Sequence, residues 1–324
     1  MDITHLSEKF NHTLSTLRYG ESPAELYEPI RYIMALGGKR IRPLLVLLAA
    51  EMYNKDVEKA LLPAAAIELF HNFTLMHDDI MDRAPLRRGE QTVHEKWNAN
   101  IAILSGDVML VRAYQQLLGV EQSKLAQVLE RFSETAAQVC EGQQLDMNFE
   151  QREQVSIPEY IRMITLKTAV LLGLSLELGA ILQNAPISDA EHLKAFGHNI
   201  GIAFQLRDDL LDVYGDKVKF GKQVGGDILS NKKTFLMLTA LEQADEQQLQ
   251  TIRSWRNHTH ESIAEEKVSA VTAVYDALNI RHQTEQQIDL YFRKALQHLD
   301  AVQLPEERKA TIRGLALQLM EREN

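Results

Sequence analysis

Apolar residues recur at spacings of three and four along most of the chain. This spacing places them on one face of an α-helix, and we expect helices over Ala64 to Met81, Tyr160 to Leu182 and Leu193 to Val213. Alternation of apolar and polar residues, which would indicate strands, is hardly seen. The pattern therefore predicts an all-α protein. No repeat or clear linker divides the chain, so we expect one domain over residues 1–324.

Prolines and glycines mark where these helices begin and end. Pro43 and Pro158 are suited to the first turn of a helix, where the missing N–H costs no hydrogen bond. Residues 37–42 are therefore expected to form a loop that leads into a helix. A second loop, rich in glycine and lysine, is expected at about residues 215–231. The most polar region, residues 244–260, is expected to be a surface excursion.

Composition and charge narrow the classes of function. The chain is 45% hydrophobic and 25% charged, as is typical of a soluble globular protein. Its formal net charge of −10 argues against a nucleic-acid partner, because such proteins need a basic face. The single cysteine, Cys140, excludes an internal disulfide and a cysteine zinc cluster. The residues after Met1 do not resemble a secretory signal, and a cytoplasmic location is expected.

The most apolar stretch, Thr168 to Leu182, is expected to be a core helix. It contains Glu177 and is shorter than the roughly 20 apolar residues that cross a bilayer. We therefore expect no integral membrane segment.

Two acidic clusters share the pattern Asp-Asp-x-x-Asp. They occupy residues 78–82 and 208–212, both within helical sequence. Residues four apart lie on one helix face, so Asp78 projects with Asp82, and Asp208 with Asp212. Such like charges destabilise a helix unless a cation compensates them, and Mg²⁺ prefers oxygen ligands. A solvated acidic face is the alternative, but both clusters interrupt apolar stretches, which disfavours it.

Basic residues accompany the first cluster. Arg87 and Arg88 follow it closely, and the loop containing Lys39 and Arg42 offers further positive charge. These could be surface ion pairs, which contribute little to stability. They could instead bind phosphate oxygens, which arginine does with two parallel hydrogen bonds. His71 lies about two helical turns before the first aspartate and faces the same way.

Together these pieces resemble the trans-type isoprenyl diphosphate synthases, the family of farnesyl and geranylgeranyl diphosphate synthases. The matching segments follow one another in family order, at residues 37–43, 68–71, 77–82, 87–89, 142–146, 167–168, 204–212 and 221–234. Any one of them is weak evidence, whereas the ordered set is specific.

The resemblance implies a role for each matching residue. Isopentenyl diphosphate would be bound by Lys39, Arg42, His71 and Arg88. Magnesium would be ligated by Asp78, Asp82 and Asp208, with Asp212 a weaker candidate. The allylic diphosphate would be held by Arg87, Lys167, Lys222 and Lys232. Thr168 and Gln205 would lie along its allylic carbons. The resemblance also implies the helical isoprenoid synthase fold with a central substrate cavity, and a homodimer.

Product length is expected to depend on the residues before the first motif. In this family the residue five positions before the first aspartate often forms the floor of the tail pocket, and here it is Phe73. Thr74, the next residue, leaves more room than a second aromatic side chain would. This combination resembles geranylgeranyl synthases, so C20 is expected first, C15 next and longer products last.

Three other functions remain as alternatives. A terpene cyclase would need no second diphosphate site and usually carries a different second metal motif. A non-catalytic subunit of a prenyl synthase complex would be expected to lose one aspartate motif. A helical scaffold with acidic faces would leave the ordered basic residues unexplained. The chain-terminal residues 320–324 are not basic, and no role is assigned to them.

Overall fold

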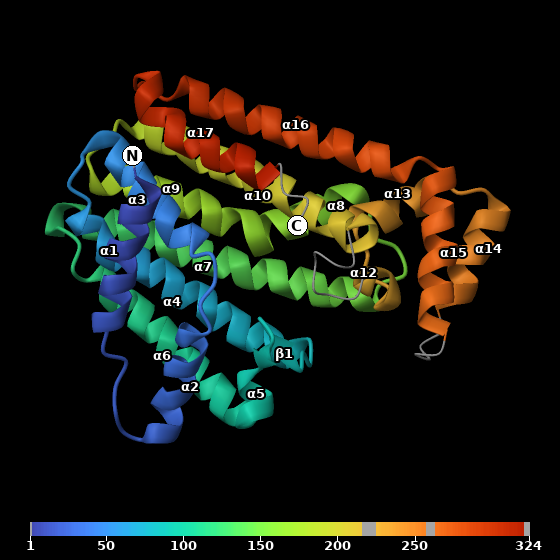
Figure 1. Cartoon of the computed structure of the whole chain (residues 1–324), viewed down its shortest axis with the longest axis horizontal. Coiled ribbons are helices and arrows are strands. Elements are labelled where there is room, and N and C mark those ends of the chain that lie inside the picture. Colours follow the sequence, from blue (N-terminus) through green and yellow to red (C-terminus); the bar gives the residue numbers. More distant parts are fainter. Residues whose placement is uncertain (1, 216–224, 257–262, 321–324) are drawn as a thin grey trace. The chain divides into compact units, whose positions relative to one another are not determined.

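The computed structural model describes residues 2–215, 225–256 and 263–320, and its contacts divide the chain into two compact units. Unit 1 contains Met1–Ala136, Leu171–Lys194 and Ala301–Ile312, and unit 2 contains Ala137–Val170, Ala195–Asp300 and Arg313–Asn324. Almost every described element is a helix (Figure 1), which confirms the predicted all-α class. The single domain over 1–324 stays a prediction.

Unit 1 begins with helices that follow one another along the chain. They are α1 (Ile3–Thr16), α2 (Ala24–Ala35), α3 (Ile41–Tyr53), α4 (Glu58–Met81), α5 (Val93–Lys96) and α6 (Ala99–Leu117). Between α4 and α5 a small antiparallel hairpin pairs β1 (Leu86–Arg87) with β2 (Glu90–Gln91). Unit 1 also includes most of α9 (Val170–Leu182).

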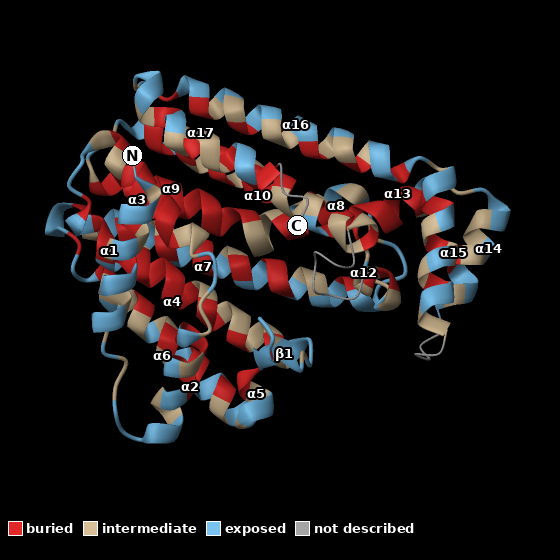
Figure 2. Ribbon diagram, viewed as in Figure 1, coloured by how far each residue is buried: buried red, intermediate tan, exposed pale blue. Residues whose placement is uncertain are grey.

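The core of unit 1 is built around α4, which packs against both α3 and α6. Most residues of α4 are buried (Figure 2), and the small side chains Ala64–Ala66 allow neighbouring helices to come close. Helix α9 also approaches α3 closely: a Cβ on Gly179 would lie 2.3 Å from the carbonyl oxygen of Val46. This packing surrounds α4 and fixes where its C-terminal aspartates lie.

Unit 2 contains the remaining helices. Entirely within it are α8 (Ile157–Ile164), the π-helical segment η1 (Thr165–Ala169), α12 (Gly226–Leu229), α13 (Phe235–Gln243), α14 (Glu246–Arg256) and α15 (Ala264–Ala277). Besides α9, whose first residue Val170 belongs to unit 2, four described helices have residues in both units: α7 (Gln122–Gln151), α10 (Ile187–Tyr214), α16 (Ile280–Ala301) and α17 (Glu306–Met320).

The predicted helices are confirmed, with shifts at their ends. Helix α4 begins at Glu58, six residues before the expected start, and α10 begins at Ile187. Pro43 lies in the first turn of α3, as predicted. The start of α8 carries a capping box, because the Ser156 hydroxyl accepts from the Glu159 N–H and the Glu159 carboxylate accepts from the Ser156 N–H.

Two loop predictions need correction. Gly226–Leu229, inside the loop expected at 215–231, forms the one-turn helix α12. Glu246–Arg256, inside the expected surface excursion, forms the helix α14. The polar sequence hid this helix because only one of its residues, Ile252, is buried.

One helical stretch, Ile157–Leu182, is long and apolar enough to cross a membrane by length and composition alone. However, 78% of its most apolar window is buried within the protein. That burial is what the sequence predicted for a core helix.

Candidate functional site

The first aspartate cluster lies at the C-terminal end of α4. Asp82 follows the last helical residue, and its N–H donates to the Asp78 carbonyl at 2.8 Å, so the two residues lie one turn apart. Asp78 is half-buried and Asp82 is exposed. Both are thus placed at the end of a core helix in unit 1, close to solvent.

The middle aspartate of this cluster has a different environment. Asp79 is only 2% exposed, and the Nε of Arg87 donates to both of its carboxylate oxygens at 2.8 Å. The Nη2 of Arg87 lies 2.6 Å from the same carboxylate. Arg87, expected to hold the allylic diphosphate, therefore pairs with Asp79 in this structure.

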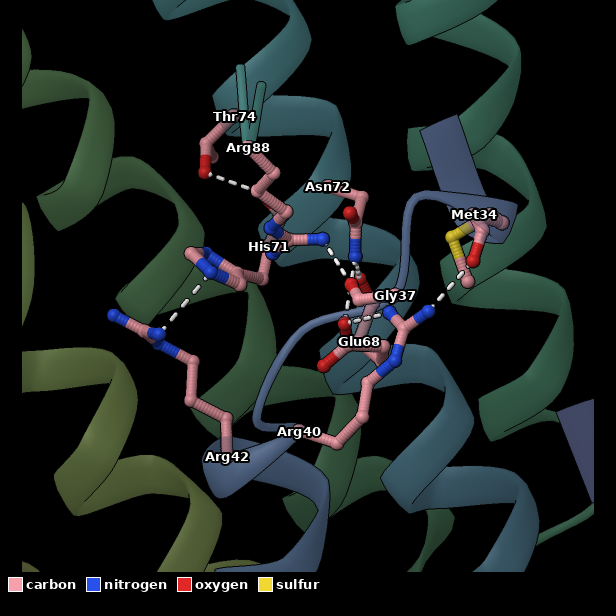
Figure 3. A network of polar contacts seen from close by, with 9 residues as sticks. All are labelled: Met34, Gly37, Arg40, Arg42, Glu68, His71, Asn72, Thr74 and Arg88. Atoms are coloured by element: carbon pink, nitrogen blue, oxygen red, sulfur yellow. Dashed lines mark hydrogen bonds and ion pairs between the residues drawn. The ribbon is translucent and has the colours of Figure 1, made fainter. Parts of the chain in front are cut away.

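A basic cluster lies where the 37–42 loop meets α4 (Figure 3), and it contains one paired arginine. Arg40 forms an ion pair with buried Glu68 and donates to the Met34 carbonyl at 2.6 Å. Glu68 also accepts from the Asn72 amide at 2.7 Å. Arg40 and Asn72 both donate to the Oε1 of this carboxylate, and among the described residues Arg40 is the arginine that forms an ion pair with it.

Arg42 and His71 contact each other through Nη1 and Nε2 at 3.1 Å. A guanidinium only donates hydrogen bonds, so the Nε2 of His71 accepts and carries no proton. Burial, reinforced by the neighbouring arginines Arg42 and Arg88, holds the pKa of His71 well below its usual value. His71 is therefore neutral near pH 7.

Positive charge in this cluster is left without a carboxylate among the residues described. The buried Nε of Arg42 has no hydrogen-bond partner, and burial lowers the pKa of Arg42 to about 10. Arg88 donates to the carbonyl of Gly37, and burial followed by repulsion from Arg40 lowers its pKa. An unpaired buried donor is costly, so this cluster is suited to an anion.

Of the four residues expected to bind isopentenyl diphosphate, three therefore lie together: Arg42, His71 and Arg88 (Figure 3). The fourth, Lys39, is exposed in the same loop. Gly38 permits this arrangement, because it has φ +123° and a Cβ there would lie 2.8 Å from the Arg88 guanidinium carbon.

Phe73 and Thr74, the residues expected to limit product length, lie on α4 in unit 1. Phe73 is buried, and its ring lies 5.6 Å from Phe70 and 4.8 Å from His77 in tilted and edge-on contacts. Phe70 in turn packs edge-on against Phe132 of α7. The Thr74 hydroxyl donates to the carbonyl of His71 at 2.8 Å.

In unit 2, Lys167 and Thr168 both lie in the π-helical segment η1. A π-segment has one more residue per hydrogen-bonded turn than an α-helix, and such segments are frequent at functional sites. The Lys167 ammonium donates to Asp146 of α7 at 2.6 Å. Gly142 of α7 makes room for this segment, since a Cβ there would lie 2.2 Å from the Lys167 backbone nitrogen.

A chain of hydrogen bonds runs from Thr168 into the second aspartate cluster. The Thr168 hydroxyl donates to the side-chain oxygen (Oε1) of Gln205 at 3.3 Å, and the side-chain amide of Gln205 donates to Asp209 at 3.0 Å. The buried Tyr160 hydroxyl donates to the other Asp209 oxygen. Burial and then Asp227 raise the pKa of Asp209 to about 7, although both hydrogen bonds oppose this rise. Asp209 thus orients other side chains.

The other residues of the second cluster lie near α12. Asp208 is exposed, and half-buried Asp212 accepts from the N–H of Asp227 at 2.9 Å. Burial, followed by repulsion from Asp227, raises the pKa of Asp212. Lys232 lies 3.4 Å from Asp227. Lys222 lies outside the described residues.

These carboxylates fit a magnesium ion whose remaining ligands come from phosphate and water. Within residues 2–215, 225–256 and 263–320, no three His, Cys, Asp or Glu side chains form a group able to hold a metal. Magnesium, however, usually takes only one or two protein carboxylates. Burial and then Asp227 raise the pKa of Asp212, and a bound cation would favour its charged form.

Sequence reasoning did not assign Tyr160, Asp146 or Asp227, which hold Asp209, Lys167 and Lys232 in this structure. The Gly142 to Asp146 segment and Asp227 fell within matching motifs, so they carried a signal. Tyr160 carried none, since it reads as one more apolar position of a core helix.

Comparison with known proteins identifies a matching family and similar sequences and structures. A family model described as polyprenyl synthetase matches residues 23–277. A geranylgeranyl diphosphate synthase of Methanosarcina mazei is 42% identical over 243 residues, which cover 74% of this chain and 75% of the relative. A crystal structure of a geranylgeranyl pyrophosphate synthase superposes with a TM-score of 0.95 at 42% identity, covering 100% of both chains. One from Pyrococcus horikoshii gives 0.91 at 33% identity, covering 99% of this chain and 98% of that one.

The chain belongs to the polyprenyl synthetase family. The predicted resemblance and the predicted fold class are both confirmed.

Proposed function

We propose that this protein is a short-chain trans-prenyltransferase that condenses isopentenyl diphosphate with allylic diphosphates to give geranylgeranyl diphosphate, with farnesyl diphosphate as the nearest alternative. The proposal rests on one observation: this member of the family contains both the basic cluster around Arg42 and two aspartate motifs. Relatives named geranylgeranyl and short-chain isoprenyl diphosphate synthases, at 42% and 40% identity, support the predicted enzyme class.

In the proposed reaction, Arg42, Arg88 and Lys39 bind the diphosphate of isopentenyl diphosphate, with neutral His71 as a further contact. The unpaired Nε of Arg42 supports this role, because a phosphate oxygen would supply its missing acceptor. Arg88 donates to the Gly37 carbonyl and forms no ion pair with a carboxylate of the described residues, which supports this role as well.

The allylic diphosphate is bound by the aspartates and by basic residues. Asp78, Asp82 and Asp208, with Asp212 as a weaker ligand, would hold Mg²⁺. When bound, this ion neutralises the charge of the leaving diphosphate. Arg87, Lys167, Lys222 and Lys232 hold the same diphosphate. Arg87 and Lys167 are each anchored by one carboxylate, Asp79 and Asp146, which supports a fixed position for them.

The reaction breaks the C1–O bond of the allylic diphosphate and forms a bond from that C1 to C4 of isopentenyl diphosphate. A proton then leaves C2, and the departed diphosphate is the base. The hydroxyl oxygen of Thr168 and the side-chain oxygen of Gln205 stabilise the developing allylic cation. Preorganised dipoles are effective here because they need no reorientation. Their hydrogen bonds to each other and to Asp209 support this preorganisation.

We also propose a homodimer. Leu104, Val111 and Leu118 are 57%, 55% and 61% exposed, and their seven-residue spacing places them on one side of α6 and its C-cap. An identical stripe on a second copy would cover these side chains. Light scattering should give twice the 36.9 kDa chain mass, and Val111→Glu should shift the protein to monomer. A monomeric wild type would refute the homodimer.

A cytoplasmic location is proposed as well, in keeping with Cys140, which forms no disulfide.

The function is tested by product analysis. Purified protein is incubated with labelled isopentenyl diphosphate, Mg²⁺, and dimethylallyl, geranyl or farnesyl diphosphate in turn, and the dephosphorylated products are chromatographed. We expect a linear C20 alcohol, and Asp82→Asn serves as the impaired control. Failure to elongate any starter, with correct folding, would overturn catalysis and favour a non-catalytic subunit. Products beyond C20 would indicate a longer-chain synthase.

A further inference from the structure

Lys267 of α15 is a buried lysine with no carboxylate partner among the residues described. Its side chain is 2% exposed, and burial alone lowers its pKa. The ammonium donates to the carbonyl of Leu229 at 3.1 Å and to the side-chain oxygen of Asn231 at 2.8 Å. A buried cation that is balanced only by neutral acceptors is costly, so a merely structural reason for it is weak.

Both acceptors belong to the turn that presents Asp227 and Lys232. Leu229 is the last residue of α12, so its carbonyl is one that the helix itself leaves unpaired. Asn231 has φ +55°, and its amide donates to the carbonyl of Arg256, the last residue of α14, at 3.1 Å. Asn231 is therefore bound from two sides, by α14 and by α15.

The held turn connects directly to the second aspartate motif. The N–H of Lys232 donates to the Asp227 carbonyl at 2.9 Å, and the N–H of Asp227 donates to the Asp212 carboxylate at 2.9 Å. The N–H of Gly225 donates to the Asp212 carbonyl. Gly225 also touches α15, since a Cβ there would lie 2.6 Å from a methyl of Val268.

We infer that Lys267 is a positioning residue for magnesium diphosphate binding: through Leu229 and Asn231 it holds the α12 turn, and with it Asp227, Lys232 and the Asp212 carboxylate. The inference rests on the proposed function for the identity of the bound group, while the positioning itself is a property of this chain alone. Lys267 touches no substrate in this account.

Three variants test the inference. Lys267→Met keeps an unbranched side chain that is one atom shorter, and it removes the ammonium. Asn231→Gly removes one of the two Lys267 hydrogen bonds together with the amide bond to Arg256, and glycine tolerates φ +55°. The matched control is Lys124→Met in unit 1, because Lys124 is also buried and donates to a helix-terminal carbonyl, that of Leu182, at 2.6 Å.

The first readout is amide hydrogen exchange, which needs neither metal nor activity. Loss of a hydrogen bond from a charged donor should speed exchange at Leu229 and Lys232 about tenfold or more in Lys267→Met and Asn231→Gly, while Lys124→Met leaves these amides unchanged. Because both variants lose the Lys267–Asn231 bond, the double variant should exchange more slowly than the product of the two single effects predicts. If Lys267→Met folds and exchanges at the wild-type rate, the inference is overturned. If Lys267→Met does not fold, the same result in Asn231→Gly overturns it.

The second readout is calorimetry with inorganic pyrophosphate, with and without Mg²⁺. We expect the magnesium-dependent affinity to fall about tenfold in both turn variants and to stay at the wild-type value in Lys124→Met, even if all three lower the melting temperature. Unchanged affinity despite faster exchange would refute the link to diphosphate. A wild type that synthesises no prenyl product while the exchange result holds would refute the proposed function and leave the positioning intact.

Discussion

Replacing Gly142 by alanine should damage the site of unit 2 through a single methyl group. Gly142 lies inside α7, and a Cβ there would lie 2.2 Å from the backbone nitrogen of Lys167 and 2.6 Å from its Cα. These neighbours are backbone atoms of η1, so no side-chain rotation can relieve the contact.

The size of the effect follows from that distance. Ordinary Cβ contacts begin at 3.4 Å, so α7 and η1 must separate locally by about 1.2 Å. A misplacement of about 1 Å can reduce a rate about 100-fold, and Lys167 and Thr168 lie on the displaced segment. Overpacking costs about 1–3 kcal/mol, against a gain of about 1 kcal/mol for alanine over glycine in a helix.

The assay compares Gly142→Ala with Gly314→Ala, whose added methyl meets nothing within 4 Å inside α17. Both gain the same helix propensity, so their difference isolates the contact with Lys167. We expect kcat to fall about 100-fold in Gly142→Ala and to remain unchanged in Gly314→Ala, which should be slightly stabilised. Wild-type kcat and stability in Gly142→Ala would refute the close approach.

Three further predictions concern single side chains. Glu68→Gln leaves the half-buried Arg40 guanidinium without its anionic partner, so denaturant unfolding should show a loss of up to about 3 kcal/mol. Phe73→Ala should lengthen the product seen by chromatography, and an unchanged chain length would remove Phe73 as the floor of the tail pocket. Asp209 has a folded pKa of about 7, raised from 3.8, so the folded state keeps a proton that the unfolded chain loses. The stability that Asp209 contributes should therefore fall as pH rises between about 4 and 7, so the wild type should lose stability relative to Asp209→Asn over this range.

Much of the fold was predictable because helices are local. The spacing of apolar residues predicted α4, α8 to α9 and α10, and local hydrogen-bond rules placed Pro43 and Pro158 at helix starts. The polar helix α14 was missed because this method depends on an apolar stripe, and α14 buries only Ile252.

Residues of the candidate site were recognisable by type and order along the chain. The Asp-Asp-x-x-Asp spacing alone identified both acidic clusters, and the ordered set of acidic and basic segments identified the family. The burial of Lys267 is also visible in the sequence, because Lys267 lies four and seven residues before Val271 and Val274, in the apolar stripe of α15. That position predicts burial but gives no partner.

Which partner each charged residue takes was decided by tertiary structure alone. Arg40 and not Arg42 pairs with Glu68, Arg87 pairs with Asp79, and Lys267 reaches Asn231. The physical reason is distance along the chain: periodicity describes neighbours three or four residues apart, whereas Arg40 and Glu68 are separated by 28 residues and Lys267 and Asn231 by 36. Only the packing of whole helices brings such groups within hydrogen-bond reach.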